Sequence, residues 1–122
     1  MNKNVAKRWV NALRSGKYRK TKDILKRVRG KTVSFCALGV LCDLYQKDPK
    51  TTKLKETAGT SWDENAIVIG GMDQRLPSKV KKWAGLRSDD PVVNDASIGD
   101  YNDRGYTFKR IADIIESNAA SL

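Results

Sequence analysis

The chain has 122 residues, of which 39% are hydrophobic and 31% are charged. This length suits one domain, and this composition is typical of a soluble globular protein rather than of a disordered one. No apolar run approaches the ~18 residues of a membrane span, and the N-terminal residues lack the apolar core of a secretory signal, so we expect a cytoplasmic protein with no membrane partner.

The formal net charge of +10 is concentrated in the first quarter of the chain. Residues 1–33 carry twelve Lys and Arg against Asp23 alone, a net charge of +11, whereas residues 34–122 carry a net charge of −1. Such a cluster attracts phosphate ligands and polyanions. It predicts an anion-binding face, with a basic surface that only maintains solubility as the alternative.

Two helices are predicted in the basic segment. Apolar residues at positions 5, 9, 12 and 13 follow a helical period, and Gly16 suits the position after the helix end. Ile24, Leu25 and Val28 predict a second short helix that ends at Gly30, followed by an extended stretch over residues 31–33.

The most apolar stretch, TVSFCALGVLCDLY, covers residues 32–45. Ser34 can cap a helix over residues 34–45, and apolar side chains on most sides of that helix predict that it is central and buried. Gly39 lowers the helix propensity, and the close approach of another backbone would explain its presence.

The second half of the chain predicts a hairpin and two more helices. Residues 52–57 and 66–69 are candidate strands, and Gly70 and Gly71 end this unit. Pro77 suits the first turn of a third helix that ends at Gly85, and Thr107 caps a last helix. The buried stripes of these helices are Val80, Trp83 and Ala84, and then Phe108, Ile111, Ala112 and Ile115. Residues 89–105 predict a long loop rich in Asp, Asn and Gly.

These elements predict an α+β fold: a small, mostly helical single domain with a buried central helix and a short antiparallel β-hairpin. The domain spans residues 1–122, with a basic helical segment over 1–33, the core helix over 34–45, the hairpin over 52–69 and the C-terminal helices over 77–118.

Several chemistries are excluded by residue types alone. The chain has no histidine, so Cys36 and Cys42 have no imidazole base, and two cysteines cannot complete a tetrahedral zinc site. On a helix their sulfurs point about 120° apart, which argues against a disulfide. We interpret both as core residues of a protein in a reducing compartment, with a reactive thiol at Cys36 as the alternative. The segment from Asp100 to Ile111 does not match a calcium-binding loop, because Ile111 occupies the position that needs a bidentate glutamate. No catalytic residue, metal or cofactor is therefore assigned, and we do not expect an enzyme.

Two groups of residues are candidates for ligand recognition. Polar residues crowd ahead of the helix that Thr107 caps, where free backbone amides can bind an anion, although such residues also simply hold turns. Basic residues around Tyr18 combine charge with an aromatic ring, as phosphate and base recognition requires. Trp62 is either a stacking platform or a residue that closes the hairpin onto the core. The candidate ligand- and phosphate-binding set is Arg14, Tyr18, Lys20, Lys22, Trp62, Asn102, Asp103, Arg104 and Thr107.

Five segments resemble a family of small bacteriophage and prophage proteins with no assigned activity. They are WVNALRSGKYRKTKDIL, SFCALGVLCDLY, LPSKVKKWAGL, DDPVV and DYNDRGYTFKRIADIIE, in this order. The family markers are an FC(A/C)LGVLCDL core and an ND…TFxxIAxxI ending, and the likeness covers most of the chain except residues 46–75. The resemblance implies a small cytoplasmic protein made in the host during phage infection, which works by stoichiometric binding.

The leading hypothesis is therefore a non-enzymatic protein that captures a phosphate-bearing ligand, such as a signalling nucleotide, and so counters host defence. Tyr18 and Trp62 would stack on the base while the basic residues hold phosphates. A nucleic-acid-binding accessory protein and a stoichiometric protein inhibitor of a host enzyme are the alternatives. A homo-oligomer is left open.

Overall fold

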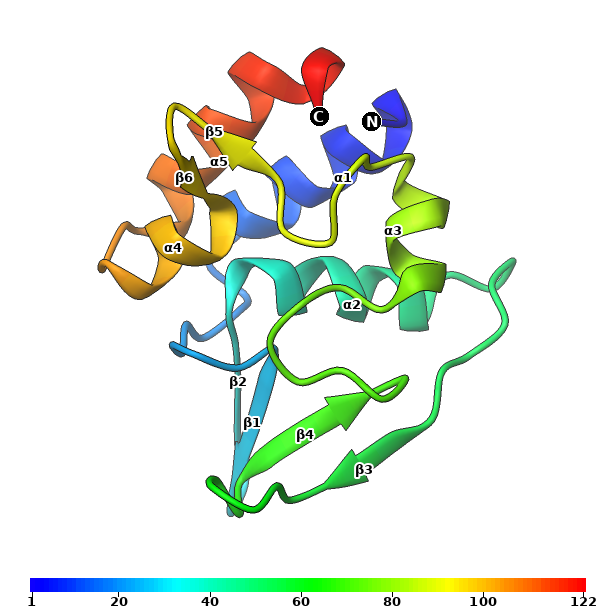
Figure 1. Ribbon diagram of the computed structural model, residues 1–122, viewed down its shortest axis with the longest axis vertical. Helices are drawn as coiled ribbons and strands as arrows, with labels where there is room; N and C mark the ends of the chain where they lie inside the picture. The colour runs from blue at the N-terminus through cyan, green and yellow to red at the C-terminus, as the bar shows by residue number, and fades with distance from the viewer.

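The computed structural model describes residues 1–122 and has an α+β fold (Figure 1). In chain order its elements are α1 (Lys3–Arg14), β1 (Lys26–Arg29), β2 (Thr32–Phe35), α2 (Ala37–Lys47), β3 (Glu56–Ala58), β4 (Ala66–Ile69), α3 (Ser78–Ala84), β5 (Val92–Val93), β6 (Ala96–Ser97), α4 (Ile98–Asp103), α5 (Phe108–Asn118) and a final 3₁₀ turn (Ala119–Ser121). None of these helices combines the length and the apolar character that crossing a bilayer would need.

Helix α2 lies at the centre of the molecule, between the α1–α5 pair on one side and the sheet on the other (Figure 1). Its residues from Ala37 to Cys42 are all buried, which confirms the prediction of a central helix. The predicted cap was wrong. Ser34 lies in β2, and Cys36 caps the helix by accepting a hydrogen bond from the Gly39 N–H at 3.4 Å. The reason is that Ser34 pairs with Arg27 in the β1–β2 ladder, so the helix cannot begin before the strand has ended.

The glycine inside α2 marks a close backbone approach, as predicted. A Cβ atom at Gly39 would lie 1.7 Å from the carbonyl oxygen of Leu25. Leu25 is fully buried in the segment that leads into β1. Only glycine therefore allows the start of the sheet to pack directly on α2.

Helices α1 and α5 pack against each other and cover α2. Trp9 of α1 is fully buried, and its indole N–H donates to the carbonyl oxygen of Ala37 at 2.9 Å. The predicted helix ends are confirmed. Gly16 follows α1 with a positive φ of 74°, and Thr107 caps α5 by accepting from the Arg110 N–H. The stripe on α5 is also confirmed, because Phe108, Ile111, Ala112 and Ile115 are its buried residues.

The main sheet has four antiparallel strands in the order β2-β1-β4-β3. The predicted helix over residues 24–28 was wrong, because these residues lead into and form β1. A short apolar run such as Ile24, Leu25 and Val28 fits a helix or a strand equally well. The strand forms here because β1 finds pairing partners on both edges, β2 and β4. The predicted strand over residues 52–57 is shorter than expected and begins at Glu56.

The predicted loop over residues 89–105 is largely ordered structure. It contains the two-stranded β5–β6 hairpin and helix α4. Asn94 and Asp95 both have positive φ, 52° and 68°, as a tight two-residue hairpin turn requires. Ser97 and Asp100 then form a capping box that starts α4. Asp and Asn are typical of turns, which explains the prediction of a loop, but here they flank the short elements β5, β6 and α4.

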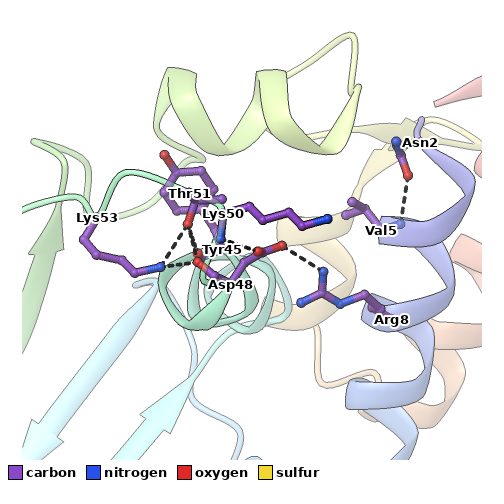
Figure 2. A network of polar contacts seen from close by, with 8 residues as sticks. All are labelled: Asn2, Val5, Arg8, Tyr45, Asp48, Lys50, Thr51 and Lys53. Atoms are coloured by element: carbon purple, nitrogen blue, oxygen red, sulfur yellow. Dashed lines mark hydrogen bonds and ion pairs between the residues drawn. The ribbon is translucent and has the colours of Figure 1, made fainter.

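The C-terminal end of α2 is tied to α1 by a polar network (Figure 2). The carboxylate of Asp48 accepts from Arg8 at 3.1 Å and from the backbone N–H of Lys50 at 2.9 Å. Thr51 and Lys53 bind the carbonyl groups at the helix end. The Lys50 N–H bond and the Arg8 guanidinium lower the pKa of Asp48.

Candidate anion-binding site

The basic segment forms one side of an open cleft of about 400 Å³. Its lining residues come from the α1–β1 connection, β1, β2 and α2, and they are Lys17, Tyr18, Arg19, Lys26, Val33, Phe35, Asp43 and Lys47. Four of the eight are cations and one is a carboxylate. We call this the basic cleft.

Tyr18 is fixed by three contacts inside the basic cleft, one of which is with Nζ of Lys47, at 5.6 Å from the centroid of the Tyr18 ring. Its hydroxyl donates to Oδ2 of Asp43 at 2.5 Å, and its ring packs edge-on against Phe35 with ring centroids 5.2 Å apart. Burial and the neighbouring Asp43 carboxylate raise the pKa of Tyr18. The hydroxyl therefore stays neutral, and the half-buried ring is held in one orientation.

Most charges of the basic cleft are already compensated by the fold. Asp43 also pairs with Lys47 at 2.7 Å, and Lys26 pairs with Glu56 of β3 at 2.8 Å. Lys17 and Arg19, by contrast, are exposed and form no ion pair. These two cations are the free positive charge at the mouth of the cleft.

Arg14, one of the predicted phosphate ligands, is engaged elsewhere. Its guanidinium pairs with Asp113 at 2.7 Å and with Glu116 at 3.0 Å on α5. It therefore joins α1 to α5 and does not line the basic cleft.

Lys20 and Lys22 are close in sequence but have different surroundings: Lys20 is bound within the fold and Lys22 is exposed. Nζ of Lys20 donates to the carbonyl oxygen of Asn102 at 2.7 Å, at the end of α4. Burial, followed by the neighbouring Lys22, lowers the pKa of Lys20. Lys22 is exposed and forms no ion pair. Only Lys22 of this pair keeps its charge free for an anion.

Asn102 is fully buried and holds three segments together. Its amide donates to the carbonyl oxygen of Thr21 at 2.8 Å, and its side-chain oxygen accepts from the Ala37 N–H at 3.0 Å. Both ends of the side chain are thus used inside the fold. Asn102 positions the basic connection against α2 and α4, and this burial leaves it no surface for a ligand.

Asp103, Arg104 and Thr107, the other predicted residues near the end of α4, do not line the basic cleft either. Oδ1 of Asp103 accepts from the Asp23 N–H at 3.0 Å, and Thr107 caps α5, while Arg104 is exposed. Asp103 lines a separate recess of about 170 Å³ together with Cys36, Gln74, Gly99, Arg75 and three further carboxylates, Asp23, Asp90 and Asp100. Burial raises the pKa of Asp90 there. Asn102 and Asp103 therefore belong to the end of α4 and not to a turn, and the recess beside them shares no lining residue with the basic cleft.

Trp62 lies in the β3–β4 loop and is 54% exposed. It does not line the basic cleft, and it does not close the hairpin onto the core. The interpretation that Trp62 closes the hairpin onto the core is therefore wrong, and its role as a stacking platform stays a prediction.

Both cysteines are free and buried, which confirms their interpretation as core residues. Burial raises the pKa of Cys36 to about 12, and it raises the pKa of Cys42 well above its usual range. Neither thiol is activated as a nucleophile.

Of the predicted set, the structure places only Tyr18 in the basic cleft. The predicted set lacks the other seven lining residues: Lys17, Arg19, Lys26, Val33, Phe35, Asp43 and Lys47. Lys17 and Arg19 stand beside Tyr18 in the sequence, so the basic run itself could have added them. Lys26 and Phe35 are opposite each other in the β1–β2 ladder, so the register of that hairpin would have paired them. No sequence signal connects either residue to Lys47 on α2.

Comparison with known proteins places the chain in a family. The family model described as "Domain of unknown function (DUF8296)" matches residues 1–119, so the chain belongs to this family. No curated protein and no solved structure matches the chain.

Proposed function

We propose that this member of the DUF8296 family is a non-enzymatic protein that captures a phosphate-bearing small ligand, in the class of signalling nucleotides, in the basic cleft. The observation that carries the proposal is the pair of uncompensated cations, Lys17 and Arg19, beside a fixed aromatic ring, Tyr18. The other charges of the cleft are paired within the fold.

The proposed binding mode follows from these positions. Phosphate groups bind at the mouth, because an arginine offers a planar fork of donors and a lysine a mobile point charge. The Tyr18 ring and the 40% exposed Val33 offer apolar surface for the base. The cleft volume of about 400 Å³ lies within the range of about 300–1,000 Å³ that is usual for small-molecule sites.

Capture alone would be enough for the proposed role. A protein that binds a signalling nucleotide without converting it lowers the free concentration in proportion to the amount of protein present. Together with the resemblance to phage proteins, this supports a function in countering host defence from the host cytoplasm.

The test is calorimetry of the purified protein against a panel of signalling nucleotides, with pyrophosphate and inorganic phosphate as simpler probes. The double variant Lys17→Ser/Arg19→Ser is expected to lose affinity about tenfold or more, since each charge-assisted hydrogen bond contributes ~1.5–3 kcal/mol. The matched control is Lys79→Ser, because Lys79 is an exposed, unpaired lysine on α3 outside the cleft.

Two results would overturn the proposal: no member of the panel binds the wild type, or the double variant binds as tightly as the wild type. The ultraviolet spectrum of the fresh protein separates the other functions. Heterogeneous nucleic acid that the wild type carries and Lys17→Ser/Arg19→Ser does not favours a polyanion in the basic cleft. A partner that survives nuclease treatment in a pull-down favours a protein inhibitor.

A further inference from the structure

The end of the β1–β2 hairpin is not paired with β4. β4 pairs with β1 only at Lys26 and Arg27, whereas the β1–β2 ladder continues to Arg29 and Thr32. Residues 29–33 are all exposed. Beyond Val28 this hairpin is therefore a two-stranded ribbon whose residues 29–33 are exposed to solvent.

The β3–β4 loop lies beside this ribbon. The Val28 N–H donates to the carbonyl oxygen of Asn65 at 2.9 Å, and Arg27 pairs with Asp63 at 2.8 Å. These contacts hold residues 59–65 at the same end of the sheet as the hairpin turn, and this loop carries the exposed Trp62. We call Arg29, Lys31 and Trp62 together the distal tip.

The charges of the distal tip are only partly balanced. Arg29 and Lys31 form no ion pair, and the Asp63 carboxylate is neutralised by Arg27. Glu64, exposed in the same loop, is the one carboxylate of this loop that remains unpaired. The tip thus combines two free cations and one opposing charge with the most exposed aromatic side chain of the chain.

The distal tip is separate from the basic cleft. Side chains alternate along a strand, so Arg29 lies on the opposite face of the sheet from Lys26, which lines the cleft. The two residues are also roughly 10 Å apart along β1, at about 3.3 Å per residue. None of Arg29, Lys31 and Trp62 lines the basic cleft.

We propose that the distal tip binds single-stranded nucleic acid, with Trp62 stacking on a base and with Arg29 and Lys31 contacting the adjacent phosphates. A cationic surface joined to an exposed aromatic ring is the combination by which proteins hold single strands without reading their sequence. This site goes beyond the nucleotide capture proposed for the basic cleft and does not depend on it.

The test measures binding of a fluorescein-labelled oligothymidine to the full chain by anisotropy at several salt concentrations. The double variant Arg29→Ser/Lys31→Ser is expected to bind about tenfold or more weakly, and its log–log salt slope should be shallower by about 1.4, at ~0.7 per phosphate contact on a single strand. Glu64→Gln should bind more tightly than the wild type, because it removes the opposing charge.

Trp62 is tested separately. Trp62→Ala is expected to weaken binding roughly fivefold or more, and Trp62→Phe to retain most of it, because a phenyl ring still stacks. Oligothymidine should quench the tryptophan emission of the wild type and leave that of Trp62→Phe unchanged, since Trp9 is fully buried and the half-buried Trp83 lies on α3, outside the distal tip. Lys79→Ser is again the control.

The proposal is overturned if the wild type does not bind the oligothymidine at low salt, if the tip variants bind it as the wild type does, or if duplex DNA binds more tightly than the single strand. The failures of the two proposals are distinguishable. Variants of the distal tip should leave nucleotide binding unchanged, and Lys17→Ser/Arg19→Ser should leave quenching of Trp62 by the oligonucleotide in place.

Discussion

Gly39 allows the sheet to pack on α2, because the Leu25 carbonyl oxygen occupies the space that a Cβ atom would need. Gly39→Ala is therefore expected to destabilise the protein by about 3 kcal/mol or more, at the upper end of the range for overpacked cores. Urea unfolding followed by circular dichroism measures the loss.

Gly99→Ala is the matched control for this prediction. Gly99 also lies in a helix, but its Cβ atom would meet the side chain of Asp90, at 2.8 Å, rather than a backbone group. A side chain can move, so we expect a smaller loss than at Gly39. Equal losses in the two variants would contradict this account of Gly39.

Asn102 is the second residue on which the architecture depends. Asn102→Ala would leave the Ala37 N–H and the Thr21 carbonyl group without their buried partners. At ~1–3 kcal/mol for each of the two unsatisfied groups, a loss of about 2–6 kcal/mol in the free energy of unfolding is expected. Asn118→Ala, which removes one half-buried bond to Ile114, should cost less than about 1.5 kcal/mol. If Asn102→Ala is as mild as this control, Asn102 does not hold the three segments together.

At the scale of the elements, α1 and α5 are joined by two contacts of different strength. The core contact is made by buried side chains such as Trp9 and Ile111, and the surface contact is the pair of Arg14 with Asp113 and Glu116. Exposed ion pairs contribute little because water and salt screen them. The packing of the two helices therefore rests on the apolar contact.

Arg14→Ala is accordingly expected to lower the free energy of unfolding by less than about 1 kcal/mol, and by still less in high salt. It should also leave nucleotide binding unchanged, because Arg14 does not line the basic cleft. Urea unfolding at two salt concentrations and calorimetry check the two parts. A large loss of ligand affinity in Arg14→Ala would contradict this prediction and show that Arg14 contributes to ligand binding.

At the scale of the whole molecule, the fold pairs part of the basic segment with carboxylates that are distant in sequence. Of its twelve cations, four form ion pairs: Arg8, Arg14, Lys26 and Arg27. The others are exposed or bind carbonyl groups. Part of the free charge that remains lies in the basic cleft, at Lys17 and Arg19, and part at the distal tip, at Arg29 and Lys31. Lys3, Lys7 and Lys22 are exposed and unpaired outside both.

These ion pairs predict how stability depends on pH. The pKa values of Asp48, Asp63 and Glu116 are lowered by hydrogen bonds, including those from Arg8, Arg27 and Arg14 respectively. A carboxyl group with a lower pKa in the folded state stabilises the fold above its unfolded pKa, and this contribution is lost as the pH falls through the folded pKa. We expect the free energy of unfolding to fall as the pH drops below about 4.

The effect of Asp90 on stability depends on pH in the opposite direction. Burial raises the pKa of Asp90, so its contribution to the free energy of unfolding is lost as the pH rises. Asp90→Asn keeps an acceptor for the Gly99 N–H and removes the charge, so it should stabilise the protein at neutral pH and change little in acid. Unfolding curves across the acid range test both groups of carboxyls. Constant stability down to about pH 2 would contradict the role given to the ion pairs.

Much of the fold follows from local patterns. The helical periods of α1, α3 and α5, together with Gly16, Gly85 and Thr107, predicted these helices and several of their ends, because caps and amphipathic stripes are properties of neighbouring residues. Gly39 also predicted a close approach without indicating its partner. The short elements β1, β5, β6 and α4 were missed because a few residues fit either period and depend on pairing for their conformation.

The amino-acid sequence alone determined the class of fold, the central position of α2, the buried cysteines and the concentration of positive charge, since each depends on composition or on spacing within one segment. Only the tertiary structure decided where that charge is free. The side chains of Arg14 and Lys20 are bound to groups on α5 and α4, so neither is free for a ligand. Asn102 is enclosed by three segments. Lys17 and Arg19 remain unpaired at the cleft. Which cations meet a carboxylate depends on residues up to a hundred positions away, and that information is absent from local sequence.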